Sequence, residues 1–292
     1  MPELPEVELA ARGLRAHLDG RRVVAIDGEW DAGPAPLLET AQTVLNRTCL
    51  GVRRRGKRMA VDFSESHTLL LHLGMTGRFV FDAVGSPPPR HQRFALVLDD
   101  ATVVRFVDQR RFGDLQAVAT AAVDTRPGWS DVGPDVFEAP LDRWTTWLSV
   151  RGPIKPALLH QHRVSGIGNI YACEGLYRAR ISPIAPAFTV APERVAALRL
   201  AIVAAMNETL ERDAAGLSRY LNEGDVENPF QIYGRESEPC PRCAAPIERI
   251  AQAGRSTWHC PACQPNVTAP AGGPFGLPAR RKATSRRRSR AL

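Results

Sequence analysis

The sequence contains no long apolar run. Nowhere in its 292 residues does an uncharged apolar stretch approach the roughly 20 residues that cross a bilayer, and the first thirty residues contain no apolar segment of signal-peptide length. These absences argue against a membrane protein, and we expect a cytoplasmic protein with no membrane partner. Apolar residues nevertheless make up 44% of the chain, which is enough to build substantial cores.

Acidic residues are absent from the end of the chain. After Cys263 the sequence carries seven Arg and Lys residues and no Asp or Glu. These seven account for the formal net charge of +7, so the preceding residues hold 31 basic and 31 acidic side chains. A surface that binds nucleic acid must therefore come from local clustering and not from bulk charge. The tail is also too poor in apolar residues to fold, and we expect it to be disordered.

Cysteine is scarce, and in a cytoplasmic setting its six residues favour metal binding or catalysis over disulfides. Four of them form the pattern C-x2-C-x16-C-x2-C. Each C-x-x-C pair offers two thiolates to one tetrahedral ion, and the segment between the pairs is long enough for a β-hairpin, so the pattern predicts a bound zinc ion. Cys49 and Cys173 stand alone, and we expect both to be buried structural thiols. The predicted zinc ligands are Cys240, Cys243, Cys260 and Cys263.

Periodicity divides the chain into a strand-rich part and a helical part. Apolar residues at helical spacing predict an amphipathic helix from Glu6 to about Leu18, with Pro5 in its first turn. Short β-branched and aromatic runs then predict an antiparallel sandwich or barrel up to about residue 125, with a hairpin turn at Asp99 and Asp100. Further helices are expected at 141–150, 154–162, 170–179 and 192–212.

Two stretches suggest anion binding. In VSGIGNIYACE, Gly166 and Gly168 form a tight connection before a predicted helix, with Asn169 at its N-cap. Such a turn lets backbone amides approach a phosphate, although an ordinary turn between two helices has the same pattern. Arg255, near the middle of the cysteine-bounded hairpin, is either a solvated surface arginine or a guanidinium presented to a phosphate.

Three further stretches have both a structural and a functional interpretation. In DQRRFG, Phe112 beside Arg110 suits a wedge between stacked bases, but a core phenylalanine next to surface arginines gives the same pattern. Met75 in HLGMTG is more typical of a core residue. VRRRGKRM is by default a solvated charge run, but its position beside an apolar strand makes Lys57 a candidate for a groove.

The first residues, MPELPEVE, contain a candidate nucleophile. A terminal α-amine has an ordinary pKa of about 7.8 against about 10.4 for lysine, so much more of it is neutral at pH 7. If Met1 is removed, Pro2 is a secondary amine that can attack a sugar C1′ and form an iminium. Glu3 is then placed to shuttle protons to the sugar ring oxygen, and Glu6, one helical turn away, to hold the amine or a water. On these residues alone, the prolines as helix-start residues remain the stronger interpretation.

The stretches PELPEVE, GKR, HLGMTG, DQRRFG, SGIGNIYA, YGR and the four cysteines, in this order, resemble the formamidopyrimidine-DNA glycosylase family from Pro2 to about Gln264. The resemblance implies an α+β fold with an antiparallel β-sandwich, a helical domain with a helix-two-turns-helix motif, and a four-cysteine zinc finger. The implied segments are 1–128 for the catalytic sandwich, 129–234 for the helical domain, 235–264 for the finger and 265–292 for a basic tail that adds salt-sensitive DNA affinity.

The same resemblance implies a bifunctional enzyme of base excision repair. It excises oxidised purines, namely 8-oxoguanine and formamidopyrimidines, from duplex DNA and then cleaves the abasic site by β and δ elimination. Pro2 is implied as the Schiff-base nucleophile, Glu3 as the general acid, Glu6 as its support, Lys57 for β elimination and Arg255 for δ elimination. One structural Zn²⁺ and a monomer are expected. The implied DNA contacts are Met75, His91, Arg110, Phe112, Arg151, Lys155 and Asn169, of which Met75, Arg110 and Phe112 fill the void left by an everted base.

Two departures from the family pattern bear on the substrate. Segment 219–235, which corresponds to the loop over the everted base, is shorter than in the family, and Gln109 stands where proline is common. Two alternatives therefore remain: a glycosylase of the endonuclease VIII type that prefers oxidised pyrimidines, and a noncatalytic protein that binds lesions.

Overall fold

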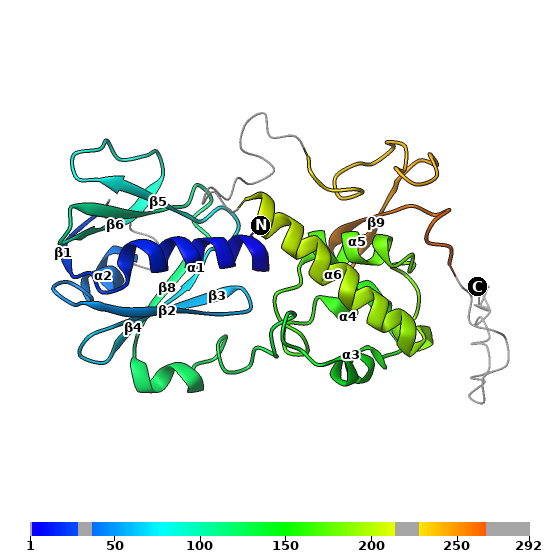
Figure 1. Ribbon diagram of the computed structural model, residues 1–292, viewed down its shortest axis with the longest axis horizontal. Helices are drawn as coiled ribbons and strands as arrows, with labels where there is room; N and C mark the ends of the chain where they lie inside the picture. The colour runs from blue at the N-terminus through cyan, green and yellow to red at the C-terminus, as the bar shows by residue number, and fades with distance from the viewer. Residues whose placement is uncertain (1, 29–36, 214–227, 267–292) are drawn as a thin grey trace, which may run out of the picture.

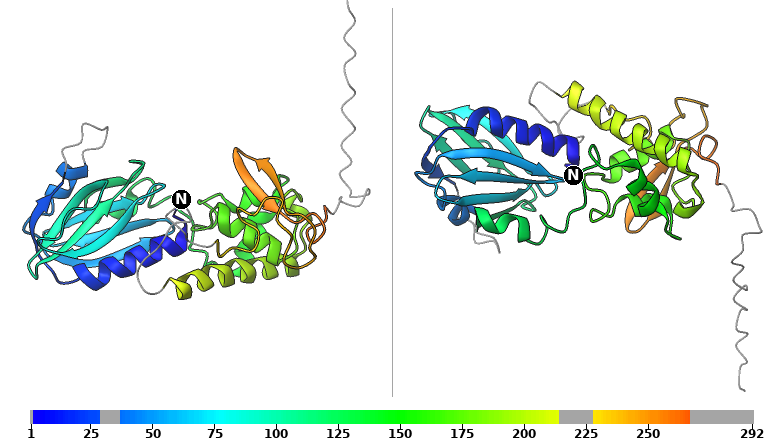
Figure 2. Two further views of the ribbon diagram at one scale, coloured as in Figure 1. Left: turned by 90° about the horizontal axis from the view of Figure 1, so that it is seen from above. Right: turned by 60° about the horizontal axis from the view of Figure 1, so that its bottom comes forward.

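The computed structural model describes residues 2–28, 37–213 and 228–266 and contains two lobes (Figures 1 and 2). Helix α1 (Leu4–Leu18) begins where the lobes meet and runs along the first of them. The tail predicted to be disordered lies outside the described residues apart from its first two positions. Within the described ranges, no helix has the length and apolar character needed to cross a membrane.

The first lobe is the predicted antiparallel sandwich. One sheet has the strand order β1-β6-β7-β5, the other has the order β2-β3-β4-β8, and every pairing is antiparallel. Asp99 and Asp100 lie in the turn between β6 and β7, as predicted. The strands are β1 (Val23–Asp27), β2 (Cys49–Arg55), β3 (Arg58–Phe63), β4 (His67–His72), β5 (Arg78–Ala83), β6 (Gln92–Leu98), β7 (Thr102–Val107) and β8 (Asp114–Ala119).

Strand β2 corrects the interpretation of VRRRGKRM as a solvated charge run. The run covers the end of β2, the turn and the start of β3, and its arginines have specific partners. The Arg53 guanidinium donates two hydrogen bonds, of 2.7 and 3.0 Å, to the Asp62 carboxylate on β3. Arg55 Nη2 donates to the Val132 carbonyl at 2.8 Å. Strand β8, helix α2 (Leu37–Gln42) and the 3₁₀ helix η1 (Thr120–Thr125) were not predicted individually.

The second lobe contains the predicted helices and the cysteine hairpin. Helix α4 ends earlier than predicted because the Gln161 amide group closes a turn, donating to the Ile167 carbonyl at 2.8 Å and accepting from the Gly166 amide at 3.0 Å. Helix α3 also ends two residues early. The elements are α3 (Leu141–Leu148), α4 (Ile154–Leu158), α5 (Asn169–Arg178), η2 (Ala187–Thr189), α6 (Pro192–Arg212), β9 (Glu248–Gln252) and β10 (Arg255–His259).

Helix α1 contributes to the cores of both lobes. Leu4 is fully buried in the core of the helical lobe, together with Tyr171 and Leu198. Further along the same helix, Val7, Ala10, Ala11, Leu14 and Leu18 belong to the core of the sandwich. The start of the chain is therefore fixed at the junction of the lobes by apolar packing on both sides.

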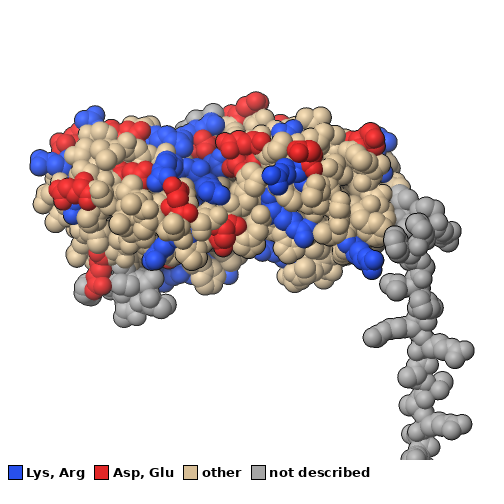
Figure 3. Space-filling model, turned by 90° about the horizontal axis from the view of Figure 1, so that it is seen from below, with Lys and Arg blue, Asp and Glu red and all other residues tan. Residues whose placement is uncertain are grey.

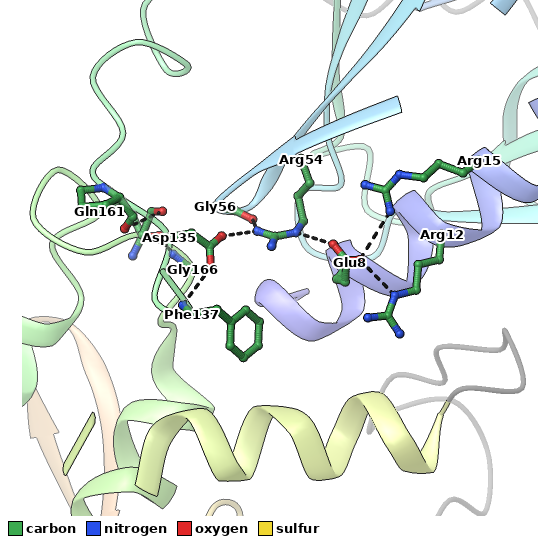
Figure 4. A network of polar contacts seen from close by, with 11 residues as sticks. Glu8, Arg12, Arg15, Arg54, Gly56, Asp135, Phe137, Gln161 and Gly166 are labelled. Atoms are coloured by element: carbon green, nitrogen blue, oxygen red, sulfur yellow. Dashed lines mark hydrogen bonds and ion pairs between the residues drawn. The ribbon is translucent and has the colours of Figure 1, made fainter. Parts of the chain in front are cut away.

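Arg54 forms a polar connection between the lobes (Figure 4). Its Nε donates to Glu8 on α1 at 2.7 Å, and its Nη1 donates to the Gly56 carbonyl at 3.1 Å and to the Asp135 carboxylate at the start of the second lobe. Only 12% of the Arg54 side chain is exposed. Burial opposes ionisation of Glu8, but hydrogen bonding and attraction to Arg54 outweigh it and lower the pKa of Glu8.

Replacing Arg54 by Met should destabilise the protein by about 2–4 kcal/mol, because two carboxylates then lose their shared, largely buried cation. Arg53→Met is the matched control, since its ion pair is 42% exposed on the arginine side and should contribute less than about 1 kcal/mol. Urea unfolding at pH 7 measures both changes. Because the pKa of Glu8 is lowered, the Glu8 part of the difference should persist above the ordinary glutamate range and shrink as the pH falls below it. Equal effects of the two substitutions would contradict this assignment.

Candidate active site

The Glu3 carboxylate lies at the N-terminus of α5. Its Oε1 accepts a hydrogen bond from the Ile170 amide at 2.9 Å, and its Oε2 accepts one from the Tyr171 amide at 3.3 Å. A Cβ on Gly168 would lie 2.2 Å from the Glu3 carboxyl carbon, and one on Gly166 would lie 2.2 Å from a methyl carbon of Leu4. These glycines therefore admit the start of the chain, and the Ile170 and Tyr171 amides at this helix end bind the Glu3 carboxylate.

Glu6 lies one helical turn further on and is also buried. Its Oε2 accepts the Glu3 amide at 2.8 Å, and its Oε1 accepts the Tyr171 hydroxyl at 3.2 Å. Burial, and then the negative charge of Glu3, raise the pKa of Glu6. Pro2, one residue before Glu3, is buried at the same junction, and Pro5 occupies the first turn of α1 as predicted. The structure thus brings together the first three predicted catalytic residues.

Lys57 reaches this group from the turn between β2 and β3. Its Nζ donates to the Ile167 carbonyl at 3.1 Å, next to the glycines that receive Glu3. Burial lowers the pKa of Lys57, attraction to Glu3 opposes the shift, and the positive charge of Arg255 adds to it. The Lys57 ammonium from the β2–β3 turn and the two carboxylates from the start of the chain therefore lie within electrostatic reach of one another.

Two residues near the site were missed by sequence reasoning. His72 ends β4 opposite Arg58, and burial, followed by the positive charges of Arg58 and Lys57, lowers its pKa. Glu174 is fully buried on α5 and accepts the amides of residues 231, 232 and 233 at 2.9–3.1 Å, which fixes the start of the YGR stretch. For Glu174, the only signal in the sequence was a polar residue next to an apolar run.

Residues 214–227, which include much of the loop expected to be short, lie outside the described residues.

The candidate wedge forms where two loops of the sandwich meet. The Arg110 amide donates to Thr76 Oγ1 at 2.9 Å, which joins DQRRFG to HLGMTG. The Arg110 guanidinium lies 5.0 Å from the centre of the Phe112 ring, and 55% of Phe112 is exposed, so Phe112 is not a core residue. Met75 is half-buried in the HLGMTG loop. The His91 carbonyl accepts the Asp108 amide at 3.0 Å, so His91 lies beside the same loops.

The hairpin of β9 and β10 lies against α4 and α5. Asn169 is the first residue of α5, and Gly168 is the N-cap, so the predicted capping role is wrong. Asn169 Nδ2 instead donates to the Ser256 carbonyl at 2.9 Å, next to the exposed Arg255. Lys155 is fully buried, and its Nζ donates to Thr257 Oγ1 at 2.6 Å, so it faces the hairpin and not solvent.

Arg151 is exposed in the segment between α3 and α4. On the face in Figure 3, Lys and Arg side chains are mixed with Asp and Glu, consistent with the charge balance up to Cys263.

The four cysteine sulfurs fit a tetrahedral metal ion. All four Sγ atoms lie within 4.8 Å of one another, and the closer pairs are separated by 3.5–3.9 Å. Ligands about 2.3 Å from a central ion, as in zinc–thiolate sites, are separated by about 3.8 Å along each tetrahedral edge. The predicted ligand set is therefore assembled around one point. Lone Cys49 and Cys173 are buried, as expected.

Comparisons with known proteins match three successive parts of the chain to one family of enzymes. Residues 1–115 match the formamidopyrimidine-DNA glycosylase N-terminal domain, residues 133–220 match its H2TH domain, and residues 237–266 match the zinc finger found in FPG and IleRS. Formamidopyrimidine-DNA glycosylase from Pelotomaculum thermopropionicum is 36% identical over 90% of this chain and 99% of that protein. Formamidopyrimidine-DNA glycosylase from Acidiphilium cryptum is 38% identical over 89% of this chain and 98% of that protein.

A solved structure extends the agreement to three dimensions. Lactococcus lactis Fpg in complex with DNA containing an abasic site superposes with a TM-score of 0.80 at 26% identity, covering 91% of this chain and all of that one. The matched domains occur in the same order as the sandwich, helical lobe and cysteine hairpin described above. The chain belongs to the formamidopyrimidine-DNA glycosylase family.

Proposed function

We propose that this protein is a DNA glycosylase and abasic-site lyase of base excision repair that removes oxidised purines from duplex DNA. The observation that carries the proposal is the convergence of Pro2, Glu3, Glu6 and Lys57 at the lobe junction. Family membership supports it. So do Lactococcus lactis Fpg complexes with DNA containing Fapy-dG or an abasic site.

The chemistry begins, after removal of Met1, with attack of the Pro2 amine on the sugar C1′. The C1′–base bond breaks, and ring opening leaves a positively charged iminium. Glu3, held rigidly by two amides, delivers a proton toward the sugar ring oxygen. Glu6, with its raised pKa, accepts and returns the proton of the amine more readily than an ordinary glutamate.

The iminium acidifies the C2′ proton, and its removal expels the 3′ phosphate. Because burial lowers the pKa of Lys57, the neutral form of that side chain is more accessible than in an ordinary lysine, which suits it to remove this proton. A second elimination expels the 5′ phosphate and leaves a one-nucleotide gap. Arg255 and Asn169, on opposite sides of the contact between the hairpin and α5, are suited to bind the flanking phosphates.

Borohydride trapping tests the covalent step. The wild-type protein should form a trapped complex with DNA containing 8-oxoguanine, and intact-mass measurement should show a chain without Met1. Pro2→Gly should lose cleavage but keep noncovalent binding, and Glu3→Gln should slow base release by about a hundredfold or more. Glu39→Gln, exposed on α2, should match the wild type. A wild-type protein with a free Pro2 terminus that binds lesions without trapping is a noncatalytic binding protein.

The same assay with thymine glycol and formamidopyrimidine, each opposite C or A, measures lesion preference. This series is informative because one structure contains Lactococcus lactis Fpg with DNA carrying an oxidised pyrimidine. Faster release of thymine glycol than of 8-oxoguanine would assign the protein a pyrimidine preference.

The wedge gives an independent prediction. Phe112→Ala should reduce excision of a damaged base from duplex DNA by about tenfold, because stacking of a base on an aromatic ring contributes about 1–3 kcal/mol. Cleavage of a single-stranded abasic site should change little, since no base must be displaced. Phe188→Ala on η2 is the matched control, because Phe188 is 57% exposed against 55% for Phe112. Equal rates for both variants on duplex DNA would refute the wedge assignment.

The cysteine site gives a prediction of metal content. The purified protein should contain one zinc ion per chain by elemental analysis, held by the four cysteines. Cys243→Ser, at the exposed ligand, should lose the ion and weaken DNA binding, because the metal fixes the hairpin that carries Arg255. Cys49→Ser, a buried cysteine in the other lobe, should retain zinc. A metal-free wild-type protein with full DNA affinity would contradict this role.

A further inference from the structure

Helix α5 is attached at both ends to the finger, that is, to the segment 237–266 that contains the four cysteines and the hairpin of β9 and β10. At its N-terminus, Asn169 Nδ2 donates to the Ser256 carbonyl at 2.9 Å. At its C-terminus, the Arg242 guanidinium donates to the Tyr177 carbonyl at 2.7 Å and to the Arg178 carbonyl at 3.3 Å. Asn169 and the Tyr177 and Arg178 carbonyls lie near opposite ends of the helix, so the two attachments are separated by about 12–14 Å along its axis. Arg242 thereby binds carbonyls of the last helical turn, of which that of Tyr177 also accepts the Arg180 amide at 3.0 Å.

Tyr177 makes a second contact at the same end of α5. It is fully buried, and its hydroxyl oxygen lies 3.3 Å from Cys240 Sγ. A metal-bound thiolate carries no proton, so in the metal-loaded protein the phenol must be the donor. Backbone amides of the finger itself also donate to these sulfurs, among them Arg242 to Cys240 and Cys263 to Cys260, both at 3.4 Å. Tyr177 is the donor that comes from the helical lobe.

Arg242 and Cys240 contact the same aromatic ring. Arg242 lies two residues after Cys240 in the first C-x-x-C pair, and its guanidinium stacks 4.3 Å from the centre of the Tyr177 ring. Phenylalanine would fill this space and keep the stacking, but it would leave the sulfur without the hydroxyl donor. The hydroxyl therefore has a function separable from packing, because donors to metal ligands orient the ligand and tune its bond to the metal.

We propose that Tyr177 is a positioning residue. Its O–H···S bond to Cys240, together with the stacking of Arg242, fixes the metal-bound finger on α5 and so sets the position of Arg255 relative to Asn169. The part of the proposal that concerns DNA rests on the proposed function, whereas the part that concerns the metal does not.

Cobalt substitution tests the hydrogen bond directly. In the full-length protein loaded with Co²⁺, Tyr177→Phe should shift the thiolate-to-cobalt charge-transfer band to longer wavelength, because the sulfur lone pairs are no longer stabilised by a donor. Zinc release to a colorimetric chelator should accelerate by about tenfold. Tyr233→Phe removes a hydroxyl near the finger that interacts with Asn169 and, in the described residues, hydrogen-bonds to none of the four ligand sulfurs, so it should leave the cobalt band unchanged. A wild-type band and release rate for Tyr177→Phe would overturn the proposal.

A double-mutant cycle tests the positioning of Arg255. Affinity for duplex DNA containing a tetrahydrofuran abasic analogue should fall by about threefold to tenfold in Tyr177→Phe. It should fall no further when Arg255→Gln is already present. An equal loss in both backgrounds would show that Tyr177 does not act through Arg255 and would overturn that part. If the wild-type protein binds no DNA, the proposed function fails, while the cobalt spectrum and zinc release still decide the Tyr177 assignment.

Discussion

The carboxylate of Glu3 at the N-terminus of α5 is the contact on which the geometry of the site depends. Through this contact the start of the chain is bound to the helical lobe, where Leu4 is buried in the core. That insertion requires Gly166 and Gly168, because any side chain there would occupy the space of Leu4 and Glu3. Pro2 is then positioned by covalent connection, one residue from a carboxylate that cannot move without breaking two hydrogen bonds.

The second constraint is electrostatic and comes from Arg54. The same guanidinium binds Glu8 on α1, Asp135 in the second lobe and the Gly56 carbonyl, so it fixes the turn that carries Lys57 while it joins the lobes. Burial of these charges is tolerated because each has a partner of opposite charge. The cost of burial is visible where pairing is incomplete, in the lowered pKa of Lys57.

Local patterns were enough to predict an antiparallel strand-rich lobe, helices α1, α3, α4, α5 and α6 and the cysteine site, because apolar periodicity and ligand spacing are properties of short segments. The choice of a sandwich over a barrel came from the family resemblance. Local patterns were insufficient for β2, because the partners of its arginines lie on β3 and in the second lobe, outside the segment itself. They were also insufficient for Glu174, whose three amide donors lie more than fifty residues further along the chain. The glycine turn before α5 was identified, but the carboxylate bound there is that of Glu3, from the start of the chain.

Helix α5 connects the two kinds of chemistry in the proposed enzyme. Its N-terminal amides hold the acid Glu3, and its C-terminal carbonyls are bound by Arg242 of the finger. A helix of three turns buried on most sides moves as a rigid rod, since bending it would break backbone hydrogen bonds. In the proposed enzyme, a phosphate bound by Arg255 and the acid Glu3 would both be positioned by this one helix, because Asn169 holds the hairpin at the same N-terminus whose amides hold Glu3.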